Sequence, residues 1–173
     1  GYVALLSYAE HLSDATIVKT DFTACNLINA DFSGVTLQDV NLEKAGLSRA
    51  IFKGTEFNNV NMVGADLSLT IFDDVDLSKV RLQKAQFAQS TVEDMNFNGQ
   101  DLTEVVFDKG KVAGSRFEKA KLNGTSFFDT EVSKNFFKNA QMLKADFDGA
   151  YIFKSIFDNA ELTKANFASA NIE

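Results

Sequence analysis

Residues that could carry acid–base, nucleophilic or metal chemistry are few in this sequence. The chain has one histidine, His11, and one cysteine, Cys25. General acid–base catalysis needs a positioned partner as well as a suitable pKa, and His11 precedes the regular part of the chain. Cys25 stands where alanine is usual, which favours a small core residue over a nucleophile. No Cys/His cluster with zinc spacing, no P-loop and no GxGxxG motif is present. We therefore expect no enzyme activity, no cofactor and no bound metal.

Composition narrows the function classes further. The formal net charge is −7, which argues against direct nucleic-acid binding because that binding neutralises phosphates with Lys and Arg. No apolar run approaches the roughly 20 residues of a membrane span, so we expect no membrane insertion. One cysteine excludes an internal disulfide. A chain of 173 residues with 45% hydrophobic residues is typical of one soluble domain.

The strongest pattern is a period of five. Every fifth residue from Leu12 to Ile172 is Leu, Ile, Val, Met or Phe, which establishes an internal repeat. Two positions earlier the residue is usually small, often alanine, and the residue between the two is often Asp or Asn. We expect these Asp and Asn side chains to bind backbone or to face solvent.

A period of five fits neither a helix nor a straight strand. Five residues rotate a helical stripe by about 140°, and an odd step reverses the face of a strand. The pattern requires a corner after every five residues. The small and the large residue then face inward together, and the next two residues form the corner, where glycines such as Gly54 and Gly114 relieve backbone strain.

A second period of 20 residues gives the number of sides. At this spacing phenylalanines follow phenylalanines, as in the column Phe97, Phe117, Phe137, Phe157, and β-branched residues follow each other, as in the column Val92, Val112, Val132, Ile152, Ile172. Four sides per coil follow. About eight coils stacked at the strand spacing of ~4.8 Å would make a column about 40 Å long.

With these features the chain resembles the pentapeptide-repeat proteins, whose repeat reads A-[DN]-[LF]-x-x. The resemblance implies an all-β fold, a right-handed quadrilateral β-helix, over residues 12–173. Residues 1–11 precede the repeat and are rich in helix formers, which predicts a short N-terminal capping helix. Plain, loop-free members of this family occur in cyanobacteria and in the chloroplast thylakoid lumen. The sequence leaves the location open between the cytoplasm and, by this resemblance, the thylakoid lumen. Met95, Gln100 and Asn135 depart from the small-residue rule, and we expect wider or wetter coils there.

The repeat runs to the last residues with no cap after Ile172. Open ladder edges invite pairing. We therefore expect that the chain is a segment of something longer, or that its last coil meets a partner or a second copy.

Acidic residues concentrate in the middle of the chain. Asp73 and Asp74 precede Glu93 and Asp94 by one 20-residue coil, so like charges should stack about 5 Å apart; Asp76 adds to this candidate acidic patch. One interpretation is a solvated face that maintains solubility. The other is mimicry of DNA phosphates, because the family includes quinolone-resistance proteins that resemble DNA and bind DNA gyrase. We favour the solvated face, since the acidic column continues into Gly114, Lys134 and Lys154 and the loops and C-terminal helix of the gyrase-binding members have no counterpart here.

Large apolar residues also fall on outward positions near the C-terminal end. Exposed aromatic clusters are costly unless something covers them. Two interpretations remain open: packing among the side chains at the corners, or an interface with a partner protein. The residues are Phe128, Phe136, Leu143, Tyr151, Phe153 and Ile156, with Ile51 and Ile71 as a smaller pair at the other end.

The sequence thus favours a non-enzymatic protein-binding or scaffolding module. It would be a rigid rod that docks into a larger complex through its aromatic end. The alternative is a DNA-mimicking inhibitor or protector of a type II topoisomerase. Neither interpretation identifies the partner.

Overall fold

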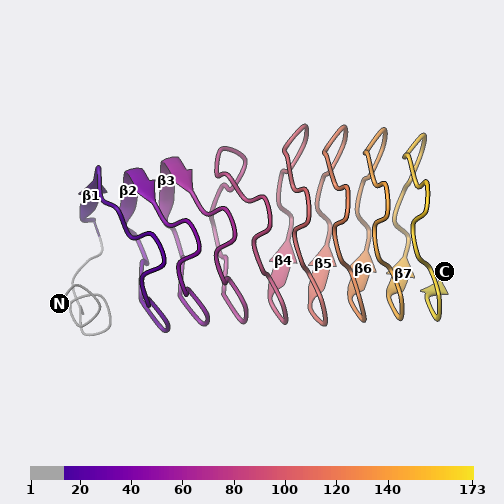
Figure 1. Ribbon diagram of the computed structural model, residues 1–173, viewed down its shortest axis with the longest axis horizontal. Helices are drawn as coiled ribbons and strands as arrows, with labels where there is room; N and C mark the ends of the chain where they lie inside the picture. Colours follow the sequence, from indigo (N-terminus) through magenta and orange to yellow (C-terminus); the bar gives the residue numbers. More distant parts are fainter. Residues whose placement is uncertain (1–13) are drawn as a thin grey trace.

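The computed structural model describes residues 14–173, so the predicted capping helix over residues 1–11 lies outside the described residues. The chain forms an all-β solenoid of about eight turns with coils of about 20 residues, stacked side by side from the N-terminal to the C-terminal end (Figure 1). The predicted fold class is confirmed. Among residues 14–173 no helix is long and apolar enough to cross a membrane.

Within residues 14–173, eight short parallel strands mark the most regular sides. They form a three-stranded and a five-stranded sheet, each in sequence order. The pairing register is 20 residues throughout, as in Leu37 opposite Phe57 and Val112 opposite Val132. The strands are β1 (Thr16–Val18), β2 (Thr36–Asn41), β3 (Glu56–Asn61), β4 (Thr91–Glu93), β5 (Lys111–Ala113), β6 (Glu131–Ser133), β7 (Tyr151–Phe153) and β8 (Asn171–Ile172).

The four sides of the coil are named here by their central large residues. Side 1 contains the column of Phe97, side 2 that of Leu102, side 3 that of Phe107 and side 4 that of Val112. Strands β1 to β3 begin on side 1, whereas β4 to β8 lie on side 4. In Figure 1 the labelled strands accordingly move from the upper edge of the rod to the lower edge.

Each corner is made by one residue in the left-handed backbone conformation. At every fifth position from Asp14 to Ser169, with Lys79 as the exception, φ is positive. Most of these residues are Lys, Asn, Asp or Glu and not glycine, although the left-handed conformation costs an L-residue on the order of 1–2 kcal/mol. The expectation that glycine relieves the corners holds only in part, because the ladder imposes the same conformation on other residues.

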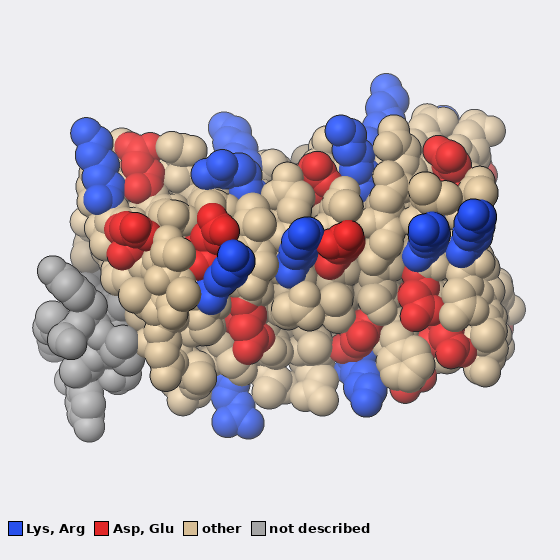
Figure 2. Space-filling model, viewed as in Figure 1, with Lys and Arg blue, Asp and Glu red and all other residues tan. Residues whose placement is uncertain are grey.

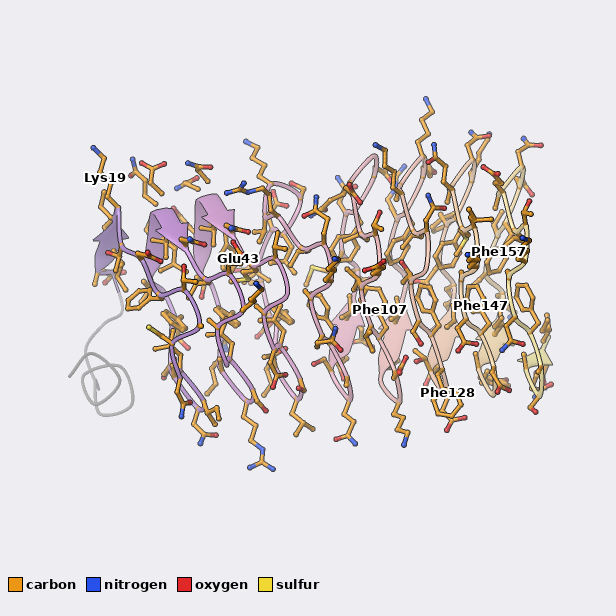
Figure 3. The ribbon with its side chains drawn as sticks, in the orientation of Figure 1. Lys19, Glu43, Phe107, Phe128, Phe147 and Phe157 are labelled. Atoms are coloured by element: carbon orange, nitrogen blue, oxygen red, sulfur yellow. The ribbon has the colours of Figure 1, made fainter. Side chains whose placement is uncertain are left out.

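The large inward residues stack on their counterparts one coil away. In the side 1 column the rings of Phe117 and Phe137 lie 4.9 Å apart between centroids, and those of Phe137 and Phe157 lie 4.8 Å apart. In the side 3 column Phe127 and Phe147 stack at 4.8 Å. Figure 3 shows Phe107, Phe147 and Phe157 inside the rod. The like-with-like stacking that predicted four sides is therefore the packing of the core.

The Asp or Asn before each large residue binds the backbone, as expected. Its Oδ1 accepts the N–H of the residue two positions later, at 2.9 Å from Ser33 to Asp31 and at 3.0 Å from Val63 to Asn61. This short local bond fixes the entry to the corner. The same bond recurs at Asp21, Asn26, Asn41, Asp66, Asp76, Asn96, Asp101, Asp146 and Asn166.

Most polar residues at the small inward position follow a second rule, the exceptions being Thr20, Thr70 and Ser115, which donate to nearer carbonyl oxygens. The other side chains donate to the carbonyl oxygen of the large residue 23 positions earlier, on the preceding side of the previous coil. The distances are 2.8 Å from Thr55 to Phe32, 2.9 Å from Thr125 to Leu102 and 3.0 Å from Ser155 to Val132. Buried hydroxyls are thereby paired without water.

Asn135 follows this rule, contrary to the expectation of a wetter coil. Its side chain is 0% exposed. Its Nδ2 donates to Val112 O at 2.7 Å, and its Oδ1 accepts the N–H of Ser115 at 2.9 Å. Gln100 also donates to two carbonyl oxygens, those of Leu77 and Val80, but its buried Oε1 has no partner. Met95 is buried.

The corners differ in one hydrogen bond. We call a corner closed when the N–H of the small residue after it donates to the carbonyl oxygen of the large residue before it. Most corners are closed, as where Ala45 N–H donates to Leu42 O at 3.0 Å. Strands β2 and β3 instead run continuously through the corner between sides 1 and 2. That corner is closed from Leu77 onward, as in Gln100 N–H to Phe97 O at 3.1 Å.

The corner between sides 4 and 1 changes in the opposite direction. It is closed after Phe52, where Thr55 N–H donates to Phe52 O at 3.2 Å. It is open after Val112, where the N–H of Ser115 binds the side chain of Asn135 instead. The open corner therefore moves from one edge of the rod to another within the coil of residues 71–80.

The ladder is interrupted at this change. Residues 75–79, side 1 of that coil, form no β-bridge with either neighbouring coil in the described structure. Opposite them, side 3 is continuous, because Asp66 pairs with Gln86 and Gln86 with Val106. Side 2 is bridged from Asn61 to Arg81 but not from Arg81 to Asp101, whereas side 4 stays bridged through Ile71. The ladder is thus interrupted on side 1 and in part on side 2, and it is continuous on sides 3 and 4.

A substitution in the core tests the inward assignment. Ala145 is fully buried, so Ala145→Phe should overfill the stack and lower the free energy of unfolding by about 1–3 kcal/mol. The outward Asp148→Asn should be nearly silent. Chemical denaturation followed by circular dichroism measures both, and equal effects would contradict the assignment.

Asn135 tests the second rule. Asn135→Leu keeps the volume but leaves Ser115 N–H and Val112 O buried without a partner, which costs on the order of 1–3 kcal/mol per group. Asn135→Ser should recover most of this loss, because Ser155 makes equivalent bonds one coil later. Denaturation midpoints in the order wild type, Ser, Leu are expected; a Leu variant as stable as wild type would disprove the rule.

Candidate interaction surfaces

Side chains that could together bind a metal do not gather in the part of the chain that the structure describes. Between residues 14 and 173 no group of three or more His, Cys, Asp or Glu side chains could hold a metal ion. Cys25 is partly buried and packs against the core, at the inward position expected for it. His11 lies outside the described residues. The surfaces that remain are an acidic and an apolar one.

All five residues of the acidic patch line one recess. It has a volume of about 840 Å³ and lies over the interruption of the ladder on sides 4 and 1. Glu56 joins the patch, and Lys79 is the only base among the lining residues. Phe57, Phe72, Val75 and Met95 supply its apolar part. The lining acids are Glu56, Asp73, Asp74, Asp76, Glu93 and Asp94.

Several of these carboxylates have partners. Asp73 lies 3.7 Å from Lys53 Nζ, and Glu93 lies 2.6 Å from Lys111 Nζ. The bond from Glu93 raises the pKa of Lys111 above its usual value. Hydrogen bonds from the side chain and backbone of Ser78 lower the pKa of Asp76. The two lysines partly neutralise the patch.

The acidic surface is local. The column of Asp74 and Asp94 continues into Gly114, where a Cβ would collide with the Asp94 carboxylate. On the face in Figure 2, acidic and basic side chains alternate along the rod. That alternation differs from the uniform negative charge of a DNA backbone.

The apolar candidates lie on all four sides. Phe136 and Ile156 form a bridged pair on side 1, and each is 41% exposed. Tyr151 and Phe153 lie on side 4 with ring centroids 6.3 Å apart. Tyr151 is 39% exposed, and its hydroxyl donates to Glu173 at 3.1 Å, which raises the pKa of the tyrosine.

The other outward residues are partly covered. The Nζ of Lys154 lies 4.7 Å from the ring centroid of Phe153, and that of Lys109 lies 5.9 Å from Phe128. Phe128 is on side 3 and Leu143 on side 2, and both are half-buried. Figure 3 shows Phe128 at the edge of the rod, well away from Phe157. Corner packing therefore accounts for part of the set.

Ile51 and Ile71 are bridged, but they lie beside the recess in the middle of the rod and not at its N-terminal end, where the sequence placed them. Ile71 is 58% exposed and Ile51 half-buried.

Sequence reasoning located the acidic residues but not the recess. Residues 75–79 fit the repeat, so their sequence does not predict that the ladder is interrupted there. A change of cross-section is indicated only by the residue types in one 20-residue column. At the small position of side 2, valine is replaced by other residues after the interruption, in the order Val40, Val60, Val80, Gln100, Ala120.

Comparisons with known proteins agree with this architecture. A profile described as pentapeptide repeats matches with eight copies, over residues 11–43, 50–87, 136–167 and 145–173. No sequence relative was found among curated proteins.

Three solved structures are similar to this chain at low identity. HetL, a pentapeptide repeat protein involved in heterocyst differentiation regulation from the cyanobacterium Nostoc sp. strain PCC 7120, is 19% identical, with 98% of this chain and 91% of that one covered and a TM-score of 0.47. Rfr23 from the cyanobacterium Cyanothece 51142 is 13% identical, with 91% of each chain covered and a TM-score of 0.46. Full-length QnrB1, a plasmid-mediated fluoroquinolone resistance protein, is 14% identical, with 94% and 93% covered and a TM-score of 0.40. Because the profile covers more than half of the described solenoid, this chain belongs to the pentapeptide-repeat family.

Proposed function

We propose that the chain is a protein-binding or scaffolding module that docks through the C-terminal part of sides 4 and 1. The observation that carries the proposal is the exposure of Phe136, Ile156 and Tyr151 on an otherwise regular β-ladder. Among the six sequence candidates, these three remain uncovered by a neighbouring lysine or a corner.

The ladder makes this surface rigid. Phe136 and Ile156 are paired across adjacent coils, which holds their Cα atoms at about the 4.8 Å strand spacing. Tyr151 is held by Glu173. Rigid aromatic anchors lose little entropy on binding, which is why they dominate protein interfaces.

The surroundings resemble an interface rim. Arg116 precedes Phe136 in the same column and pairs with Glu118 at 3.7 Å. An apolar centre with Arg and Tyr beside it is the usual composition of a protein-binding surface. The partner is therefore expected to present an apolar surface with acidic residues opposite Arg116.

This surface can be tested by affinity capture from the source cells. Phe136→Ser/Ile156→Ser should abolish capture of the specific partner, because it removes both anchors without touching the core. Val18→Ser/Ile28→Ser is the matched control, since Val18 and Ile28 are 46% and 45% exposed near the other end of the solenoid. Both variants must keep the wild-type circular dichroism spectrum. Equal loss in both variants, or no loss in either, would contradict the proposed surface.

The second candidate function is a DNA-mimicking regulator of a type II topoisomerase. The gathering of six carboxylates around one recess favours it. The pairing of Asp73 and Glu93 with lysines and the alternating charge on the visible face weigh against it.

A supercoiling assay separates the two functions. We expect micromolar protein to leave the supercoiling activity of purified gyrase, and its cleavage in the presence of a quinolone, unchanged. Inhibition or protection that disappears in Asp74→Asn/Asp94→Asn would establish the second function instead. A variant at Asp148 and Asp158, away from the recess, serves as the charge-matched control.

A further inference from the structure

We infer that the rod has a built-in hinge at the coil of residues 71–80. The hinge axis is the uninterrupted ladder on side 3, and bending opens or closes the acidic recess on sides 4 and 1. This inference concerns the mechanics of the fold and is independent of the partner proposed above.

The hydrogen bonds define the axis. On side 3, Leu67 N–H donates to Gln86 O and Phe87 N–H to Val106 O, both at 2.7 Å. On side 1, residues 75–79 make no interstrand backbone bond in the described structure. Side 4 is weakened but not interrupted, because Ile71 is bridged to the coils before and after it, and Gly54 N–H donates to Asp73 O at 2.9 Å. The bond from Ile71 N to Ala50 O is long, at 3.5 Å. A ladder that is intact on one side and absent on the opposite side resists stretching but not bending.

The cause is a change of cross-section. Up to β3 the extended corner lies between sides 1 and 2, and from β4 it lies between sides 4 and 1. Two coils with different corners cannot keep all four sides in register. Lys79, the one described corner residue without a positive φ, lies at the point of mismatch.

Packing is also weaker at this coil. Phe72 and Val75 are half-buried, whereas Phe52 in the preceding coil is fully buried. The side chain of Gln100 replaces part of the missing ladder by binding Leu77 O and Val80 O. Its Oε1 stays buried and unpaired. Few apolar contacts and unpaired groups are the marks of a segment that opens locally.

Charge favours the open position. Asp73 and Asp74 face Glu93 and Asp94 across the recess. The ion pairs Lys53–Asp73 and Lys111–Glu93 each stay on one side of it. The carboxylates on the two sides therefore repel each other. Molar salt weakens this repulsion, because the Debye screening length is then about 3 Å.

Distances between spin labels measure the bending. In a Cys25→Ala background, Gln38→Cys/Asn98→Cys spans three coils of side 1 across the hinge. The matched control, Asn98→Cys/Asp158→Cys, spans three coils of the same side within the continuous ladder. A third pair, Arg49→Cys/Lys109→Cys, crosses the hinge on side 3. Dipolar EPR then gives the distance distribution of each pair.

The pair across the opening should have a distribution about twice as wide as either control, because side 1 lacks a ladder at residues 75–79 and both control pairs lie along continuous ladders. Molar salt should shift it to shorter distances and leave the controls unchanged. Equal widths for the three pairs would overturn the hinge. A wide distribution that does not respond to salt would overturn the role of the carboxylates.

Hydrogen exchange gives an independent readout on the unlabelled protein. Amides of residues 75–79 should exchange at least about tenfold faster than those of residues 65–69, which belong to the preceding coil on side 3. Equal protection of the two segments would also overturn the hinge, whatever the labels report.

Discussion

The parallel backbone ladder with its register of 20 residues is the constraint on which the whole structure depends. It holds residues such as Lys44 and Lys144 in a left-handed conformation that they would not adopt alone. It also places each phenylalanine over its counterpart, so that the core is a set of stacked columns. Each coil buries its apolar side chains only against the next, which makes the fold cooperative between neighbours.

The same ladder explains the polar residues inside the rod. An open corner leaves the N–H of a small residue without its turn partner. On side 1 the hydroxyl of Ser115 and the amide of Asn135 accept these N–H groups from the previous coil. Ser115, Asn135 and Ser155 thus replace alanine where the corner between sides 4 and 1 is open, and the recess lies where the open corner changes edge.

Function in this fold depends on what the ladder leaves outside. The inward positions are fully committed to packing, so only the outward columns and the interruptions vary freely. In this chain the outward columns give an apolar surface around Phe136 and Ile156, and the interruption gives an acidic recess. Membership of the family establishes the scaffold, whereas the surfaces must supply the activity.

The sequence by itself determined the repeat, the four sides, the inward columns and the backbone-binding role of residues such as Asp31 and Asn61, because these follow from local spacing. It also selected the acidic residues that share the recess. Only the tertiary structure decided that Asn135 is fully buried, that Phe153 lies beneath Lys154, and that the ladder is interrupted at residues 75–79. Those outcomes depend on how two neighbouring coils match in cross-section. The repeat pattern is the same in both coils, so it does not predict that match.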